Sequence, residues 1–179
     1  PWPVHGSVLV RGGMVFCAAG RSSYLDGGLV LYRLDARTGK ELSQTRIDDR
    51  GGTGATGHLN DVLSCDGGLV FMRHESFDLD GNLLKQAVPH LHSAAGFLDG
   101  DWWHRTYWMF GSLMASGWGA WPNMGNRVPS GQIMVMDEQA TYGFGREQYA
   151  NGVHAGLNAR YHLVFLLHDE RLLVAQNDD

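Results

Sequence analysis

Three histidines between residues 90 and 104 have the spacing that best suits metal chemistry. His90 and His92 place two imidazoles on one face of an expected strand, and His104 follows beyond the next turn. Three histidine ligands that leave one coordination position open are typical of a catalytic zinc or copper site. No Cys or Glu lies at ligand spacing nearby, and Pro89 stands just upstream. We therefore expect no metal here, and favour hydrogen bonding of these histidines within a network that closes a sheet.

A second group of residues could bind a flat ligand. Residues 102–110 alternate large side chains on both faces of an expected strand, which favours a strand buried between neighbouring sheets. The alternative is a platform on which a glycan stacks, with two tryptophans on the Gly-rich insertion at 111–129. The residues of this candidate ligand site are Trp102, Trp103, His104, Arg105, Trp118 and Trp121.

Three further patterns resemble sites but lack their required parts. The acidic pair Asp48 and Asp49 lacks the alternating oxygen ligands of a calcium loop, which favours a solvated turn. Residues 51–54 lack the Lys-Ser/Thr ending and the helix of a phosphate loop. Ser22 and Ser23 have no nucleophile-elbow context. The sequence therefore assigns no catalytic residue.

Composition narrows the class of protein. The 179 residues include 25 glycines, which favours many turns and short strands over a helical bundle. A net charge of −5 without a Lys/Arg block makes nucleic acid a poor partner. No apolar run approaches the ~18 residues of a membrane span. Cys17 and Cys65 are compatible with one disulfide or with two small buried thiols.

The elements that would position these residues are strands joined by tight turns. Strands are expected at 7–10, 14–18, 28–34 and 41–47, the last with a short helix at 40–48 as its competitor. Asp35, Thr38 and Gly39 are expected to carry structure, because the Asp carboxylate can accept backbone N–H groups and Gly tolerates φ > 0. Four strands in about 40 residues have the size of a propeller blade.

An internal repeat extends this pattern along the chain. The triplet Gly-Leu-Val recurs at 28–30 and 68–70, and no convincing helix interrupts the strands. The expected fold is an all-β, propeller-type array of four-stranded antiparallel blades, incomplete at about three and a half blades. The blades are placed at approximately 7–47, 60–86, 95–149 and 160–179, the last truncated, in one segment of a longer protein.

Residues 34–40, Leu-Asp-Ala-Arg-Thr-Gly-Lys, resemble the repeat of quinoprotein-like, or PQQ-repeat-like, β-propellers. In that repeat a Trp four residues after the Gly docks one blade on the next, whereas here the position is Ser43. The segments 60–67 and 96–108 look like a bacterial branch of these propellers, and the resemblance covers most of 7–175. It implies an exported or periplasmic location, while the sequence itself leaves the compartment unknown.

The resemblance does not by itself imply a cofactor. Quinone-using members hold PQQ with calcium in a central pocket, which fewer than four blades do not enclose, and the adjacent cysteine pair that many alcohol-oxidising members carry is absent. We therefore expect a non-catalytic binding or scaffold segment, whose partners are the remaining blades and a glycan or protein ligand. The alternatives are part of a quinone- or metal-dependent oxidoreductase completed by further sequence, and a glycan-binding propeller.

Overall fold

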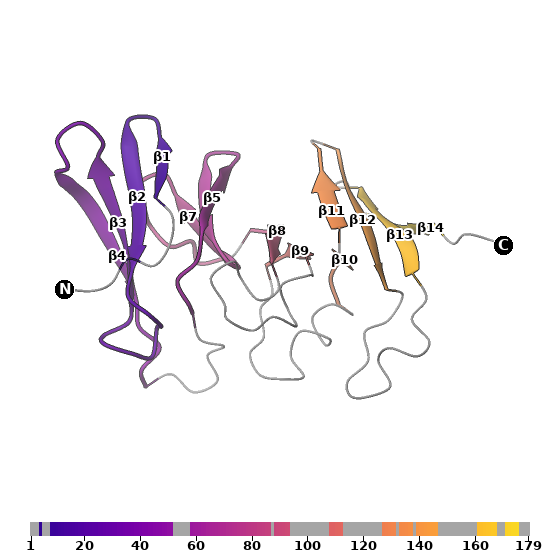
Figure 1. The fold of residues 1–179 in the computed structure, drawn as a ribbon, viewed down its shortest axis with the longest axis horizontal. Coiled ribbons are helices and arrows are strands. Elements are labelled where there is room, and N and C mark those ends of the chain that lie inside the picture. Colours follow the sequence, from indigo (N-terminus) through magenta and orange to yellow (C-terminus); the bar gives the residue numbers. More distant parts are fainter. Residues whose placement is uncertain are drawn as a thin grey trace. The chain divides into compact units, whose positions relative to one another are not determined.

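The computed structural model describes residues 4, 8–51, 58–86, 88–93, 108–112, 127–131, 133–137, 139–146, 161–167 and 171–175, the last two ranges and 145–146 by their backbone alone. The chain divides into two compact units, which are treated separately. Unit 1 is Pro1–Val88 with Gly96–Gly100, and unit 2 is Pro89–Ala95 with Asp101–Asp179. The described residues form strands and no helix (Figure 1), so the predicted all-β class is confirmed.

The first sheet of unit 1 is a four-stranded antiparallel meander. Its strands, in spatial order, are β1 (Leu9–Arg11), β2 (Met14–Ala19), β3 (Leu29–Asp35) and β4 (Glu41–Ile47). The competing helix at 40–48 does not form, because Glu41 and residues 43–47 pair with β3, with one β-bulge where the register shifts between Arg33 and Leu34. The four strands lie where the sequence predicted them.

The second sheet of unit 1 has three strands where four were expected. It contains β5 (Leu63–Asp66), β6 (Leu69–Met72) and β7 (Glu75–Asp78), all antiparallel. A four-stranded blade over 60–86 requires a fourth strand after β7, but the segment near residue 83 makes only a single bridge, Phe77 to Leu83, and one hydrogen bond from Leu84 N to Ser76 O. Leu83 is exposed, so a longer pairing of this segment would not be stabilised by burial of an apolar face.

The strands of both sheets are closed by the same kind of aspartate turn. The Asp35 carboxylate accepts hydrogen bonds from the backbone N–H of Thr38 at 2.7 Å and from its hydroxyl at 2.6 Å. The Asp78 carboxylate accepts the backbone N–H of Asn82 at 2.8 Å in the second sheet. Both turns contain a glycine with positive φ, Gly39 at 70° and Gly81 at 85°.

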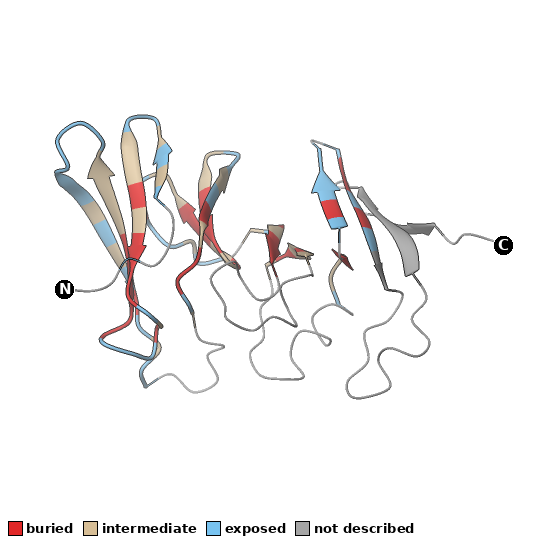
Figure 2. Cartoon of the chain, in the orientation of Figure 1, coloured by how far each residue is buried: buried red, intermediate tan, exposed pale blue. Residues whose placement is uncertain are grey.

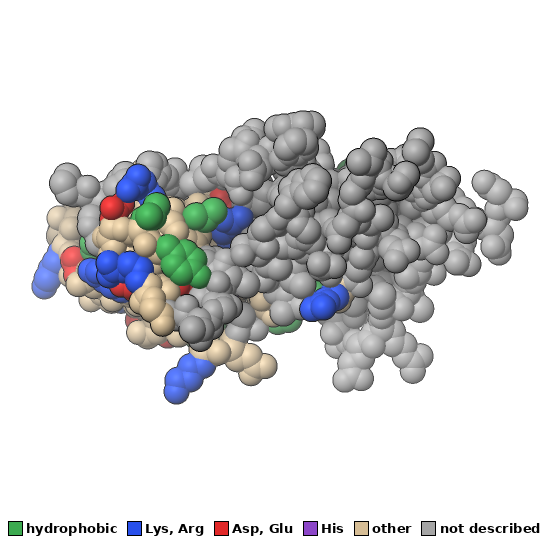
Figure 3. All heavy atoms as spheres, turned by 90° about the horizontal axis from the view of Figure 1, so that it is seen from below, with side chains coloured by type: hydrophobic (Ala, Val, Ile, Leu, Met, Phe, Trp, Pro, Cys, Tyr) green, Lys and Arg blue, Asp and Glu red, His purple; other side chains and the backbone are tan. Residues whose placement is uncertain are grey.

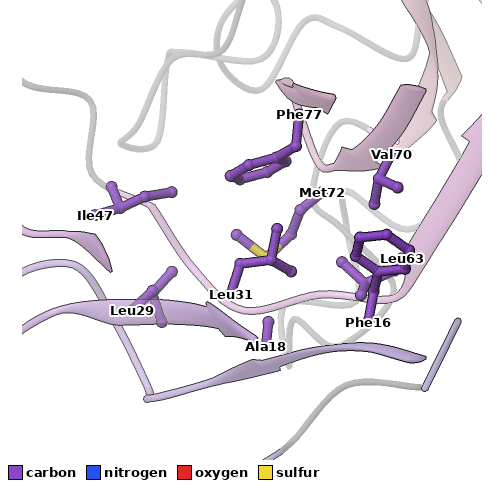
Figure 4. Packing of buried hydrophobic residues seen from close by; sticks show 9 residues of the cluster. All are labelled: Phe16, Ala18, Leu29, Leu31, Ile47, Leu63, Val70, Met72 and Phe77. Atoms are coloured by element: carbon purple, nitrogen blue, oxygen red, sulfur yellow. The ribbon is translucent and has the colours of Figure 1, made fainter. Parts of the chain in front are cut away.

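The two sheets of unit 1 share one apolar core. Figure 2 shows buried positions on β2 and on the sheet β5–β7, and Figure 4 shows the side chains pointing toward one another. Burial of this surface is the main term that holds the sheets together. The cluster consists of Phe16, Ala18, Leu29, Leu31, Ile47, Leu63, Val70, Met72 and Phe77.

Polar contacts accompany the apolar core at one edge. Ser43 of β4 donates its hydroxyl to the Asp80 carbonyl at 2.7 Å. Arg33 of β3 approaches the Asp80 carboxylate at 3.3 Å. The turn of the second sheet therefore contacts strands β3 and β4 of the first.

Unit 2 contains two further antiparallel sheets. One comprises β8 (His90–Ser93), β9 (Trp108–Gly111) and β10 (Ser130–Gly131), in the order β10-β9-β8. The other comprises β11 (Ile133–Met136), β12 (Ala140–Arg146), β13 (Tyr161–Leu167) and β14 (Arg171–Ala175), in chain order. This sheet runs across the boundary that the sequence placed between blades 95–149 and 160–179. No sheet in the described residues closes on itself.

The surface of the described part carries mixed charge. On the face drawn in Figure 3, basic side chains are interspersed with acidic ones instead of forming one patch. Arg50 and Asp48, for example, form an ion pair with 2.6 Å between a guanidinium nitrogen and a carboxylate oxygen. Within the described ranges no helix is long and apolar enough to cross a membrane, as the sequence predicted.

Candidate functional site

The candidate residues named from the sequence fall partly inside the described structure. Trp102, Trp103, His104, Arg105, Trp118 and Trp121 lie outside the described residues, so the glycan platform stays a prediction. The expected strand at 102–110 is described only from Trp108 onward, as β9. His90 and His92 lie in β8, where their geometry is defined.

His90 and His92 are buried neighbours on one face of β8. They are 6% and 4% exposed, and their ring centroids lie 5.2 Å apart at an interplanar angle of 43°. The His92 ring nitrogen Nδ1 lies 3.4 Å from the His90 carbonyl oxygen, a long contact for a hydrogen bond. No third His, Cys, Asp or Glu of the described residues joins them at metal-binding distance.

A different polar cluster lies in unit 1, and the sequence did not reveal it. Asp49, His58, His74 and Glu75, called the His58 cluster below, come from three separate segments. Asp49 follows β4, His58 precedes β5, and His74 and Glu75 belong to the hairpin between β6 and β7. Asp49 was expected in a solvated turn, but its side chain is only 16% exposed.

Ser23, which is fully buried, positions the first two members of the cluster. Its carbonyl accepts the backbone N–H of Asp49 at 3.1 Å, and its own N–H donates to the His58 carbonyl at 2.9 Å. Its hydroxyl accepts the His58 backbone N–H at 2.8 Å. The loop after β4 and the segment before β5 are thus tied to one buried serine.

The hairpin turn at Arg73 and His74 positions the other two members. Glu75 is the first residue of β7 and pairs with Met72, so only two residues make the turn. Arg73 has a φ of 54°, a conformation that costs a residue with a Cβ about 1–2 kcal/mol. Such outliers persist where surrounding structure enforces them. The turn holds His74 beside Glu75.

The side chains of the His58 cluster form a continuous chain of contacts. His58 Nδ1 lies 2.7 Å from Asp49 Oδ2, and His58 Nε2 lies 2.6 Å from Glu75 Oε1. His74 Nε2 lies 3.2 Å from the same Glu75 oxygen. The rings of His58 and His74 stack, with centroids 5.1 Å apart and planes inclined by 12°.

These contacts shift the ionisation of the cluster. Hydrogen bonds from His58 and then His74 lower the pKa of Glu75 to about 2, although burial opposes the shift. Burial lowers the pKa of His58, but the hydrogen bonds to Glu75 and Asp49 outweigh it, so that this pKa is raised. Burial tends to raise the pKa of Asp49, but hydrogen bonds with Ser23 and His58 outweigh it, so that this pKa is lowered.

We expect the metal-free protein to lose stability on both sides of a mildly acidic window. Glu75 has a depressed pKa, so its contribution is present above its ordinary value of 4.5 and is lost as the pH falls toward 2. His58 has a raised pKa, so its contribution is present below 6.5 and is lost as the pH rises through the folded-state value. Protonation of Glu75 at low pH should lower the free energy of unfolding by on the order of 2–3 kcal/mol.

Urea unfolding of the metal-free protein between pH 2.5 and 8 measures this dependence. The matched variant is Glu75→Gln, which keeps the shape of the side chain and removes its charge. The difference in unfolding free energy between parent and variant should be greatest near pH 5–6 and should shrink toward pH 3. A difference that does not change with pH would show that the ion pairs contribute nothing.

The fold and the cluster together define an all-β protein with a largely buried His, Glu and Asp network between two sheets. His58, His74 and Glu75 each offer one donor atom, and these atoms all lie within 4.8 Å of one another. They are therefore the residues of the described structure that could hold a metal ion. Comparison of the chain with protein-family models, curated proteins and solved structures gives no match.

Proposed function

We propose that this chain is a non-catalytic binding or scaffold segment, built from propeller-type blades of the PQQ-repeat-like kind. The observation that carries the proposal is the face-to-face packing of two antiparallel meanders in unit 1 over one shared apolar cluster. Propellers bury each blade on the next in this manner. Such arrays are built from repeated units, each of which buries its apolar face only by packing on its neighbour.

Two details of unit 1 support the same proposal. Each sheet carries an aspartate turn with a glycine of positive φ, at Asp35 between β3 and β4 and at Asp78 after β7. Ser43 occupies the position of the docking tryptophan in the related repeat and still contacts the neighbouring sheet, through the Asp80 carbonyl. A hydrogen bond takes the place of an aromatic contact at this point.

Native-state hydrogen exchange tests whether the sheets depend on one another. Met72→Ala removes a 2% exposed side chain from β6, so the amides of β2 and β3 should lose protection together with those of β5–β7. The matched control is Met136→Ala, at a 39% exposed position of β11 in unit 2, which should leave unit 1 unchanged. Loss of protection confined to β5–β7 would contradict the blade array.

A second measurement tests the absence of quinone chemistry. The protein is incubated with PQQ and Ca²⁺, passed through gel filtration and examined by absorbance. A scaffold should elute without the quinone spectrum. One retained equivalent of PQQ would contradict the non-catalytic assignment and favour an oxidoreductase completed by further blades.

A further inference from the structure

The donor atoms of His58, His74 and Glu75 suit a borderline-soft divalent ion. Two imidazole nitrogens and one carboxylate oxygen all lie within 4.8 Å of one another. Zinc is bound by this combination in proteins, with bonds of about 2.0–2.2 Å to nitrogen and oxygen. Calcium and magnesium prefer oxygen donors alone, so the two histidines argue against them.

The charge of the cluster calls for a cation. Asp49 and Glu75 bring two carboxylates whose side chains are 16% and 15% exposed. With neutral imidazoles the group carries two negative charges in a largely dehydrated place, which is costly unless they are compensated. One divalent ion compensates both charges at once.

The hydrogen-bond geometry of His58 leads to the same conclusion. Carboxylate oxygens face both of its ring nitrogens, Asp49 at 2.7 Å and Glu75 at 2.6 Å. When His58 is protonated its two N–H groups satisfy both carboxylates, but the neutral imidazole has a single N–H and satisfies only one of them. When Nδ1 donates to Asp49, the lone pair of Nε2 faces Glu75, and a cation between Nε2 and the carboxylate turns this repulsion into coordination. Metal-binding histidines are commonly oriented by such a carboxylate on the other nitrogen.

His74 contributes a further observation. Its side chain is 9% exposed, and its Nδ1 is a buried atom without a hydrogen-bond partner in the described structure. The ligand atom of His74 is the other ring nitrogen, Nε2, which lies 3.2 Å from Glu75 Oε1, so the buried Nδ1 is a place for a water and not for the ion. His74 follows Arg73, whose φ is 54°, in the two-residue turn between β6 and β7.

We propose that His58, His74 and Glu75 bind one Zn²⁺-like transition-metal ion, with Asp49 orienting His58. Tetrahedral zinc separates its ligand atoms by roughly 3.3 Å. His74 Nε2 and Glu75 Oε1 are already 3.2 Å apart. The distance of 2.6 Å between His58 Nε2 and Glu75 Oε1 must increase slightly to admit the ion. The ion joins the segment before β5 to the β6–β7 hairpin and leaves a fourth position for water or another donor. This inference does not rest on the propeller proposal.

Metal titration of the full chain tests the site. The protein is stripped with a chelator and titrated at pH 7.5 with Zn²⁺, and with Co²⁺, whose absorption reports tetrahedral geometry. We expect one equivalent to bind and to raise the thermal midpoint, with no response to Mg²⁺. Asp49→Asn should weaken binding about 10–100-fold, and Glu75→Gln at least as much. The control His92→Gln changes a buried histidine outside the cluster and should bind as the parent does.

Three results would overturn the proposal. One is a folded parent chain that takes up no Zn²⁺ or Co²⁺. Another is binding that persists unchanged in Glu75→Gln and in His74→Gln. The third is loss of binding in His92→Gln alone, which would move the site to β8. If His74→Gln proves unfolded by circular dichroism, the parent titration and Asp49→Asn decide the matter, because Asp49 supplies no ligand atom.

Discussion

Leu31→Ala should lower the free energy of unfolding of unit 1 by about 2–5 kcal/mol. Leu31 is 3% exposed and lies in the shared cluster between the two sheets (Figure 4). Its removal loses buried apolar surface and leaves a cavity between strands whose backbones are fixed by pairing, so the site cannot collapse fully. Urea unfolding followed by circular dichroism measures the loss.

Leu42→Ala is the matched control for this experiment. It makes the same chemical change in the same sheet, but Leu42 of β4 is 45% exposed. Its effect should stay within about 0.5 kcal/mol, as for most surface substitutions. Equal losses at the two positions would mean that Leu31 does not lie in a packed core.

Gly28→Ala should be similarly damaging for a different reason. Gly28 has a φ of 95°, and a Cβ atom there would lie 2.2 Å from the Ile47 carbonyl oxygen. That oxygen belongs to the backbone of β4, which pairs with β3 at Leu29 and cannot move away without breaking the sheet. Backbone strain of about 1–3 kcal/mol is therefore joined by a steric clash, and we expect a total loss above roughly 3 kcal/mol.

Gly39→Ala separates the clash from the strain. Gly39 also has a positive φ, 70°, but no other atom lies within 4 Å of the place that its Cβ atom would take. The expected loss is therefore about 1–2 kcal/mol from the backbone alone. The two variants are compared by urea unfolding under identical conditions. A loss at Gly28 no greater than that at Gly39 would contradict the close approach of β4.

Sequence reasoning predicted the local structure of unit 1 well. Short runs of mostly apolar residues bounded by Gly-Gly and Asp-Gly turns mark β2, β3 and β6, because an apolar run and turn chemistry are both local properties of the chain. It overestimated the second sheet, where the segment near Leu83 has a turn before it but no buried face to pack. In unit 2 the sequence did not reveal that β11 and β12 pair with β13 and β14.

The His58 cluster could not be predicted from spacing alone. Its four members lie between residues 49 and 75 and meet only because Ser23 and the hairpin turn at Arg73 bring their segments together. A Gly-rich stretch of low hydrophobicity surrounds Asp49, which favoured a solvated turn. The sequence signal that could have revealed the cluster is the pair His74 and Glu75 at the tight turn between β6 and β7, together with His58 shortly before β5. By contrast, the shared face of His90 and His92 follows directly from strand period.

The bulge between Arg33 and Leu34 has a consequence for association with other chains. It lies where β3 pairs with β4, an outer strand of its sheet in the described residues. A long flat outer strand offers unpaired backbone groups as a template for intermolecular pairing. Here the bulge increases the local twist, and exposed Glu41 and Arg46 place charge along the same strand. The strand β4 is therefore a poor nucleus for aggregation, although it is seven residues long.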